Sequence, residues 1–583
     1  MKRRFIVVDN SGTLIFTAMV IGKRGRALES AARELLRGAD PEWDTEKTMI
    51  KRTISRRALM QWALGSAVVL QGYSLTGLGS AQAAGNGLLR IGMAAPPTTL
   101  DPHLKSNAPN NALSTHIYDT LVTNDEKSES KPGLATAWRA VDDTHWEFDL
   151  RPDVRFSDGE PLTVDDVVVS FDRANTIEST ASFRTYTRNI KAITSPEAGK
   201  LVIETKSPEP LLPNSLSRIR IIRAKYKDAT SEQFNNGTAA IGTGPYVLKE
   251  YVPGNRVSLS ANPNYWGTKP ALPEVELRIV TDAGARLANL LAGDLDLVEQ
   301  VPYEGIGRVE QDERFRIVRG VSSRVVFFSL DTSRDVTPFI AGKDGKPLDR
   351  NPLKDLHVRQ ALSMAINREA IVERIMQGNA IVASQFLPAG APGTSPAIKP
   401  TPFDAEKAKA LLAEAGYPDG FRLTIHGPND RIVNDAKIVQ AVAQMLTRIG
   451  LDVSVEVMPW SVYADKADAH EFSMNLDSWG VNTGETSNPM TALVATQNPD
   501  AGMGIANSGR YSNPEVDAKL LEAKRTLDDA KRDKMLSELS EIVFNDVALI
   551  PMHHEVLVAA ARRDLQFTTR ADQYTLAMNV KTA

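Results

Sequence analysis

Two pairs of adjacent ionisable side chains are of the types that could carry out chemistry. Asp165 and Asp166 are neighbouring carboxylates, as a general acid and base can be. They follow Thr163 and precede an apolar run, and that spacing favours a capping box in the first turn of a helix. His553 and His554 would point to opposite faces of a β-strand, so they could not chelate one metal ion. We therefore predict no catalytic residue and no metal site at either pair.

Compact catalytic motifs are missing from the 583 residues. The sequence contains no H-E-x-x-H, no G-x-S-x-G and no glycine-rich dinucleotide fingerprint after a strand. The stretch GKDGKPLDRN (342–351) has two Gly-Lys pairs without the spacing of a phosphate loop, so we expect a surface loop or interdomain connection there. The chain has no cysteine, which excludes disulfides, thiolate metal sites and a cysteine nucleophile. We expect a protein that is not an enzyme and needs no cofactor.

A basic and then apolar segment, SRRALMQWALGSAVVL, begins at Ser55 and has the composition of an export signal. It carries Arg56 and Arg57, and its apolar part is diluted by Gly, Gln and Ser. The following AQA sequence is the small-x-small pattern of a signal-peptidase site. We therefore expect cleavage between Ala83 and Ala84.

The export segment leaves more than one interpretation open. Residues 55–59, SRRAL, resemble the twin-arginine pattern, and the general secretory route is the alternative. A buried or membrane-spanning helix is a third interpretation, although a span needs roughly 20 strongly apolar residues. Because the signal lies well inside the chain, we expect translation to begin at Met49. Residues 1–48 would then be an upstream extension and 49–83 a signal peptide.

The composition of the remaining chain fits an exported globular protein. Acidic residues outnumber basic ones, 72 to 68, and many of the basic residues lie before residue 84. The acidic surface expected for residues 84–583 does not favour nucleic acid or anionic lipid. Without cysteine, a lipid-anchored N-terminus is excluded. We expect a soluble periplasmic protein, not a lipoprotein, with two or three domains.

Strands and helices alternate along the chain, which predicts an α/β fold. Residues 88–93 have the apolar run of a strand, and Trp146 and Phe148 alternate with acidic residues as in a half-buried strand. Asn367 and Asp404 precede helical patterns and are expected to be their N-caps.

Six segments in order resemble the extracytoplasmic solute-binding proteins of the peptide/nickel ABC-importer family, solute-binding protein family 5, which the dipeptide- and oligopeptide-binding proteins typify. The resemblance covers about 88–565. It is carried by LDPHLKSNAPNNALSTHIYDTLVTND (100–125), LATAWRAVDDTHWEFDLRPDVRFSDGEPLTVDDVVVSFDRA (134–174), GTGPYVLKEYVPGNRVSLSANPNYWG (242–267), VRQALSMAINREAIV (358–372), AKALLAEAGYPDG (408–420) and YSNPEVDAKLLEA (511–523).

The resemblance implies a periplasmic-binding-protein type II-like fold, with two lobes, a hinge and an extra third domain. The first lobe is expected to be discontinuous, the extra domain to lie between its parts, and 342–351 to lie near the hinge. The expected ranges are 85–128, 242–345 and 551–583 for lobe I, 129–241 for the extra domain and 346–550 for lobe II.

The resemblance also implies a ligand site between the lobes. Its peptide-binding members use a Trp-x-x-Asp segment, which falls on Trp479, Gly480 and Asn482, so the acid that pairs with a peptide amino terminus is replaced by an amide. An amide cannot neutralise an ammonium group, which argues against ordinary free peptides. Glu485 is a candidate substitute, with a solvated loop residue as the alternative, and Trp460 is a further candidate.

Each of the other candidate residues also has a purely structural interpretation. Tyr463 is a weaker member of the same set, and Trp460 could equally be a core residue. In the first lobe, Asn110, Asn111 and His116 lie in the segment expected to approach the cleft, although His116 alone is more typical of a packed helix residue. A further family motif, which we expect to be structural, contains Asn262, Pro263, Tyr265 and Trp266.

The resemblance favours a monomeric solute-binding component that delivers a peptide-like or other small polar solute to membrane permease subunits. An exported carboxylate-pair hydrolase and a sensory or chaperone-like binding protein without a permease are the alternatives. Metal chelates, opines, oligosaccharides and modified amino compounds remain open as ligands.

Overall fold

The computed structural model describes residues 4–8, 14–18, 87–179, 181–481 and 483–582. Two compact units are present, Met1–Ser80 and Ala81–Ala583. In the first unit, β1 (Arg4–Val8) pairs antiparallel with β2 (Leu14–Ala18). The predicted start, export motif and cleavage site, at Met49, Arg56, Arg57, Ala83 and Ala84, lie outside the described residues.

A twelve-stranded sheet runs through the second unit. Its order is β10-β11-β12-β3-β13-β20-β14-β19-β17-β15, with β16 paired to β20 and β18 paired to β17. The end that we call the first lobe contains β10 (Tyr246–Val252), β11 (Arg256–Ala261), β12 (Glu274–Ile279), β3 (Leu88–Met93) and β13 (Leu297–Val298).

The core of the first lobe forms around β3. Leu89, Ile91 and Met93 are buried, and β12 and β13 both pair with this strand in parallel. A strand covered on both faces favours such a nearly continuous apolar run. The helices of this lobe are α3 (Ala108–Ile117), α8 (Ala283–Ala292) and α9 (Ile306–Glu310), and the short strands β21 (Leu565–Gln566) and β22 (Lys581–Thr582) lie near the end of the chain.

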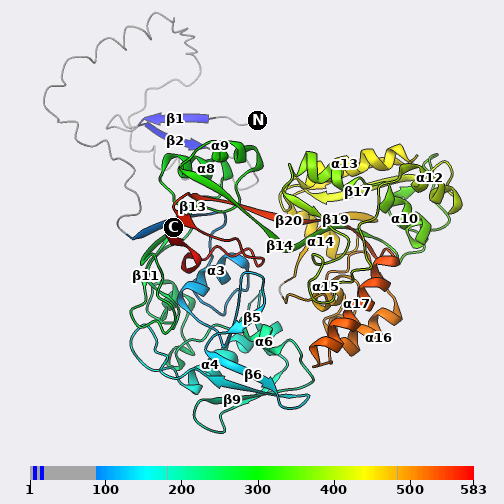
Figure 1. Cartoon of the computed structure of the whole chain (residues 1–583). Coiled ribbons are helices and arrows are strands. Elements are labelled where there is room, and N and C mark those ends of the chain that lie inside the picture. The colour runs from blue at the N-terminus through cyan, green and yellow to red at the C-terminus, as the bar shows by residue number, and fades with distance from the viewer. Residues whose placement is uncertain (1–3, 9–13, 19–86, 180, 482, 583) are drawn as a thin grey trace, which may run out of the picture. The chain divides into compact units, whose positions relative to one another are not determined.

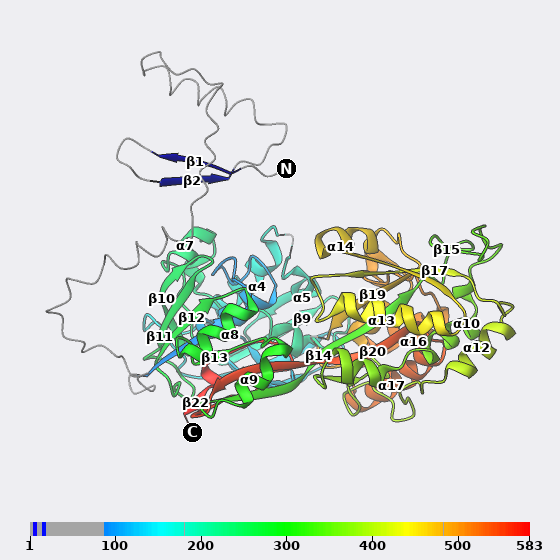
Figure 2. The ribbon, with the colours of Figure 1, turned by 90° about the horizontal axis from the view of Figure 1, so that it is seen from above.

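Two long strands connect the first lobe with the rest of the sheet. β14 (Phe315–Leu330) and β20 (Leu549–Arg562) pair antiparallel, and their register shifts between Val321 and Val325. Both views show them running as a pair out of the first lobe (Figure 1 and Figure 2). The two strands together make the connection. The loop 342–351, which we expected near a hinge, follows β15 (Ile340–Ala341), and β15 already pairs with β17.

The other end of the sheet is the second lobe. Its strands are β19 (Met474–Gly480), β17 (Arg422–Pro428), β18 (Asp452–Met458), β15 and β16 (Ala380–Val382). Helices cover them. The apolar faces of α10, α12 and α13 form one core with Phe421, Leu446 and Leu476, and α14 packs in a smaller cluster with Phe472. These helices are α10 (Leu356–Met364), α11 (Arg368–Ala370), α12 (Ala405–Glu414), α13 (Asp435–Arg448) and α14 (Trp460–Asp468).

Three further helices of this lobe pack on the other face of the crossing strands. They are α15 (Ser487–Leu493), α16 (Pro514–Ala523) and α17 (Asp529–Asn545). Val325 and Phe327 of β14 share their core.

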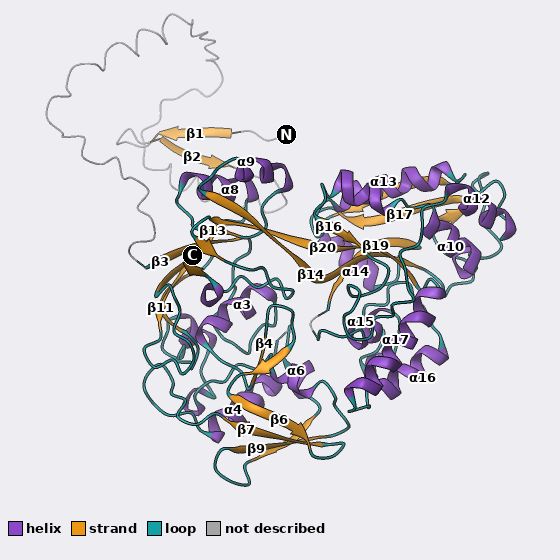
Figure 3. Ribbon diagram, in the orientation of Figure 1, coloured by secondary structure: helices purple, strands orange, loops and turns teal. Residues whose placement is uncertain are grey.

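A separate four-stranded antiparallel sheet forms what we call the small-sheet domain (Figure 3). Its order is β6 (Ala135–Ala140), β7 (His145–Leu150), β9 (Lys200–Thr205) and β8 (Ile190–Thr194), and it carries α4 (Val164–Thr176), α5 (Arg184–Thr187) and α6 (Leu212–Leu216). The next helix, α7 (Ser231–Asn235), packs its Phe234 into the core of the first lobe. The hairpin β4 (Val122–Asn124) and β5 (Ser130–Pro132) joins it to the first lobe. Leu527, which follows α16, packs against its core. Among the described residues, no helix is both long and apolar enough to cross a bilayer.

Candidate functional site

One edge of the second lobe collects the ends of parallel strands. β17 runs parallel to both β18 and β19, so the carboxyl ends of these three strands lie at the same edge. Open α/β sheets bind ligands at such edges. Arg431 follows the first strand, Trp460 follows the second, and Trp479 lies at the end of the third.

Trp460 and Arg431 form a stacked pair at this edge. The Arg431 guanidinium lies 5.1 Å from the centre of the Trp460 ring, within the range of a cation–π contact. Trp460 is half-buried and Arg431 is exposed. Asp430 fixes the start of α14, because its carboxylate accepts a 2.7 Å hydrogen bond from the Trp460 backbone N–H. The pair is therefore an accessible aromatic and cationic surface on a fixed helix start.

Tyr463, by contrast, has no surface left for a ligand in this structure. It is fully buried, and its hydroxyl donates to the Leu476 carbonyl at 2.6 Å. The same oxygen accepts from the Asn475 amide at 2.9 Å. Its ring stacks on Phe472 at 5.2 Å. These contacts commit Tyr463 to packing α14 on the sheet.

A cluster of four charges lies where the crossing strands meet this edge. Arg324 of β14 pairs with Glu555 of β20 at 3.4 Å and donates to the Ser478 hydroxyl at 3.2 Å. Burial raises the pKa of Asp477 on β19 to about 6, and the neighbouring Arg431 and Arg324 oppose that shift. Burial likewise raises the pKa of Glu555 against the same two arginines.

Trp479 begins the segment that reaches the other side of the molecule. It is half-buried, and its indole N–H donates to the Asn488 amide oxygen at 2.9 Å. Gly480 pairs with Arg324 in the sheet, and Asn482 lies outside the described residues. The Thr483 carbonyl accepts a 3.5 Å hydrogen bond from Asn214 of the small-sheet domain.

Glu485 is committed to an ion pair within the second lobe. Its carboxylate accepts from the Arg532 guanidinium at 3.0 Å and from the Ser487 hydroxyl. The Glu485 and Arg532 side chains are only 7% and 8% exposed. In this arrangement Glu485 does not offer a carboxylate to a ligand ammonium, and it is not the solvated loop residue that was the alternative.

The three candidates of the first lobe serve mainly to hold α3. Asn110 is buried and accepts from the Thr98 backbone N–H at 2.8 Å. His116 is fully buried, with Nδ1 2.9 Å from the Ala112 carbonyl and Nε2 accepting from the Ala577 N–H at 2.9 Å. Burial lowers its pKa to about 4, so it is neutral near pH 7.

Asn111 is half-buried, and its amide lies 3.4 Å from the Ser106 hydroxyl. Its backbone carbonyl accepts a 3.3 Å hydrogen bond from Arg220. Asn111 thus reaches the polar region beyond α3 through its main chain.

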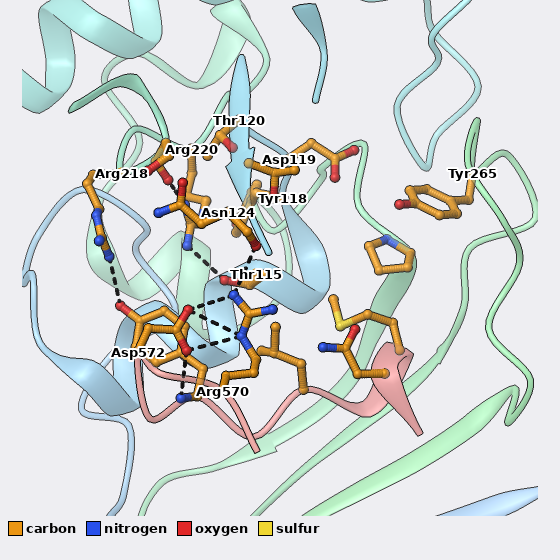
Figure 4. A pocket seen from close by; sticks show the side chains of 17 residues that line it. Thr115, Tyr118, Asp119, Thr120, Asn124, Arg218, Arg220, Tyr265, Arg570 and Asp572 are labelled. Carbon is orange, nitrogen blue, oxygen red and sulfur yellow. Dashed lines mark hydrogen bonds and ion pairs between the residues drawn. The ribbon is translucent and has the colours of Figure 1, made fainter. Parts of the chain in front are cut away.

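A cavity of about 170 Å³ lies beyond the end of α3 (Figure 4). Its walls come from four parts of the chain: the end of α3 and the hairpin that follows, the segment after α6, the first-lobe segment with Pro245 and Tyr265, and the C-terminal segment. Polar and charged residues that line it are Thr115, Tyr118, Asp119, Thr120, Thr123, Asn124, Ser217, Arg218, Arg220, Tyr265, Arg570, Asp572, Tyr574 and Asn579.

Most charges in the cavity wall have partners. Arg570 and Asp572 form a buried ion pair at 2.6 Å. Asp119 accepts from the Trp266 indole at 2.7 Å and from the Thr243 hydroxyl at 3.0 Å, and burial raises its pKa. Trp266 thus has the structural role expected for its motif, whereas its neighbour Tyr265 lines the cavity.

The cavity lies next to the segment that follows Trp479. A Cβ atom on Gly484 would lie 3.4 Å from the Ser128 carbonyl, in the turn between β4 and β5. Asn214, which contacts Thr483, lies in the helix just before the cavity residues Ser217 and Arg220. The Gln573 amide also lies 3.4 Å from Glu555 of the charge cluster. The cavity, the charge cluster and the second-lobe segment therefore adjoin one another.

Comparison with known proteins agrees with this architecture. Residues 129–501, more than half of the chain, match the middle region of the bacterial extracellular solute-binding proteins, family 5. The chain belongs to this family. It is thus a solute-binding component of the peptide/nickel class of importers, and the members of the family are binding proteins.

Several family 5 relatives are similar over most of their length. Heme-binding protein A of Haemophilus influenzae is 28% identical over 477 residues, covering 76% of this chain and 83% of that protein. The glutathione-binding protein GsiB of Salmonella typhi is 27% identical over 476 residues, covering 80% and 89%.

Solved structures share the fold. HbpA2 from Haemophilus parasuis superposes with a TM-score of 0.73 at 24% identity, covering 85% of this chain and all of that one. The murein tripeptide-binding protein MppA, in its unliganded open form, gives a TM-score of 0.71 at 23% identity, covering 85% and 97%. The two-lobed type II fold is therefore shown for this chain.

Sequence reasoning missed several residues of this family 5 site. Three members of the charge cluster, Arg324, Asp477 and Glu555, come from three strands far apart in sequence, and no local motif marks them. Arg220 and Tyr118 were also missed, although Tyr118 lies two residues beyond the candidate His116. Within the described part of the chain, no group of three or more His, Asp or Glu could hold a metal ion.

Proposed function

We propose that the protein captures a peptide-like or other small polar solute between its lobes and delivers it to membrane permease subunits. The observation that carries this is the polar cavity, which adjoins the segment following Trp479. A ligand held there would contact the first lobe and the small-sheet domain, with the second-lobe segment next to it. Ligand-driven closure would then present one compact state to the permease.

Residues of the second lobe and of the crossing strands, outside the cavity lining, also have roles in this proposal. Trp479 and the Trp460–Arg431 stack supply aromatic surface and a cation from the second lobe. Asp477 and Glu555 supply carboxylates beside Arg324, in place of the acid that the family's peptide binders carry at the position of Asn482. The ligands for which the relatives are named, which include glutathione and a murein tripeptide, support a peptide-like solute.

Opines and nickel–histidine are further candidates, because related folds were solved with agropinic acid and with Ni(L-His). In this proposal the mature chain is a monomeric, soluble periplasmic protein without a lipid anchor, exported by the signal at 49–83. Arg56 and Arg57 favour the twin-arginine route. Binding alone, without turnover, is its activity.

We also propose a division of the mature chain into three domains. Lobe I combines 85–128 with later first-lobe segments and 551–583, the extra domain is 129–241, and lobe II ends near 550. The crossing strands β14 and β20 support a hinge between the lobes, and β15 supports a start of lobe II before 346.

Thermal unfolding against a ligand panel tests the function. The panel holds di- to pentapeptides, N-blocked peptides, opines, oligosaccharides and nickel–histidine. A ligand at about 100 times its Kd adds roughly 2.7 kcal/mol to the free energy of unfolding, which raises the midpoint visibly. We expect at least one class to do so.

The variant Trp479→Ala should weaken that ligand at least tenfold. Trp138→Ala is the matched control, because Trp138 is also half-buried but packs in the small-sheet domain. Equal loss of affinity in both variants would argue against a binding site at Trp479. Chemical conversion of the ligand would argue for the exported hydrolase.

A further inference from the structure

One cation in the cavity wall has no acidic partner. Arg220 is 7% exposed, and it donates hydrogen bonds to neutral oxygens: the Ser217 carbonyl at 2.9 Å, the Asn111 carbonyl at 3.3 Å and the Thr115 hydroxyl at 2.7 Å. Among the described residues, no carboxylate oxygen lies within 4 Å of its guanidinium, and its Nε–H has no hydrogen-bond partner. A buried charge without a counter-charge is costly, so this arrangement favours an anion from outside the chain.

Two more unpartnered polar atoms lie in the same wall. The Tyr118 hydroxyl is buried and has no hydrogen-bond partner in the described structure, and the same holds for the amide oxygen of Asn124. Figure 4 shows these two side chains grouped with Arg220 on one side of the cavity, away from Tyr265. The wall therefore holds two unsatisfied donors, an N–H and an O–H, and one unsatisfied acceptor, all three buried beside the cavity.

The other charges in the wall do not remove this imbalance. Arg570 is neutralised by Asp572 at 2.6 Å, so that pair adds no net charge. Asp119 accepts hydrogen bonds from Trp266 and Thr243, and it attracts Arg220 only at longer range, without an ion-pair contact. Burial lowers the pKa of Arg220 only to about 10, so its guanidinium stays charged at neutral pH.

We propose that this cavity binds a carboxylate of the transported solute together with an adjacent N–H group. Arg220 and Tyr118 donate to the carboxylate, and Asn124 accepts from the N–H. That combination occurs at the C-terminal end of a peptide. A guanidinium–carboxylate bond is charge-assisted and stronger than a neutral hydrogen bond. The inference rests on the proposed solute-binding function and names the chemical class of its ligand.

Matched peptide probes test the proposal on the full chain. We would measure Kd by calorimetry for di-, tri- and tetra-alanine, each with a free C-terminal carboxylate and as the C-terminal amide. We expect the free-acid form of at least one length to bind ten or more times more tightly than its amide. The two probes differ only in the group that the cavity is proposed to hold.

Two variants locate the effect. Tyr118→Phe removes a hydroxyl that has no partner in the described structure, so it should fold normally and lose threefold or more in affinity for the free acid. Asn124→Asp places a carboxylate in the wall and should reduce the preference for the free acid to below threefold. Asn236→Asp makes the same charge change at an exposed residue outside the cavity and should leave the preference intact. Arg220→Gln is less informative, because the loss of three hydrogen bonds can impair folding.

Each outcome decides the proposal. Equal binding of acid and amide, or a preference that Asn124→Asp leaves unchanged, would overturn the carboxylate site and leave solute binding intact. Binding of oligosaccharides without binding of peptides would likewise overturn the carboxylate site and leave solute binding intact. If no member of the peptide and thermal-unfolding panels binds, the proposed function fails as well. If the cavity holds only water and does not select a carboxylate, the free-acid and amide peptides will bind with equal affinity.

Discussion

At the scale of single residues, burial decides what a side chain can do. His116 was a candidate ligand residue by its position, yet its Nε2 accepts from the Ala577 N–H, 461 residues away. No local pattern announces such a partner. Glu485 likewise looked available, and Arg532 of a later helix takes its carboxylate. Residue type and spacing therefore identified the right segments but not the free side chains.

The buried imidazole of His116 makes stability depend on pH. Its pKa is about 4 in the folded protein and ordinarily about 6.5. Between these values only the unfolded chain binds the proton, so the free energy of unfolding falls as the pH falls from 6.5 towards 4. His116→Gln should remove this contribution. As the pH falls from 6.5 to 4, the free energy of unfolding of the variant should therefore rise relative to that of the wild type by up to about 3 kcal/mol.

Urea unfolding of both proteins between pH 4 and 7 measures this difference. The buried histidines His103 and His554 act in the same direction, whereas the raised pKa of Asp477 acts in the opposite one. Both proteins share those groups, so their contributions cancel in the comparison. A difference that is constant over this pH range would contradict the assignment of His116 as a buried neutral residue.

The Glu485–Arg532 ion pair should be a stability element and not a ligand contact. Glu485→Gln leaves a buried guanidinium with one remaining acidic partner, Asp529, and should cost about 3 kcal/mol in the free energy of unfolding. Glu522→Gln, at an exposed position on α16, is the control and should stay within about 0.5 kcal/mol. Loss of ligand affinity with no loss of stability in Glu485→Gln would return Glu485 to the binding site.

At the scale of elements, local signals worked where the physics is local. The capping box of Thr163 and Asp166 begins α4, and Asp404 and Asn367 cap their helices as expected. The strand predicted at 88–93 is β3. Caps and apolar runs depend on neighbours a few residues away, so sequence alone reveals them.

The long crossing strands were not recognised for the opposite reason. β14 contains Arg316, Arg319 and Ser322, which interrupt any apolar alternation. These polar residues are acceptable because the strand passes from one lobe to the other, and only its last part is continuously buried. The glycine-rich loop 342–351 looked more like a connection, since turn residues are the usual signal of one.

Gly244 sets how closely the end of α3 approaches the cavity wall. A Cβ at this position would lie 2.6 Å from the carbonyl carbon of Ile117 and 2.8 Å from the Tyr118 nitrogen. Gly244→Ala should cost roughly 1–3 kcal/mol in the free energy of unfolding, because backbone atoms must move. Gly307→Ala on α9 is the control, as nothing lies within 4 Å of its added Cβ. Chemical denaturation measures both, and equal stability of the two variants would contradict this packing.

At the scale of the whole molecule, the fold brings together residues that the sequence separates. Family resemblance indicated the two-lobed fold and the Trp479 segment. It could not indicate the charge cluster, because Arg324, Asp477 and Glu555 meet only when β14, β19 and β20 pair. The cavity likewise needs α3, the segment after α6 and the C-terminal residues in place. Such sites depend on topology and not on motif.

The central claim is that the chain binds a solute reversibly and leaves it unchanged. Native mass spectrometry of the full chain with the panel ligand that raises the unfolding midpoint tests this most directly. We predict a one-to-one complex, and denaturation should release a ligand of the same mass as the one added. A released product of different mass, or no retained ligand at concentrations well above the Kd, would contradict the account.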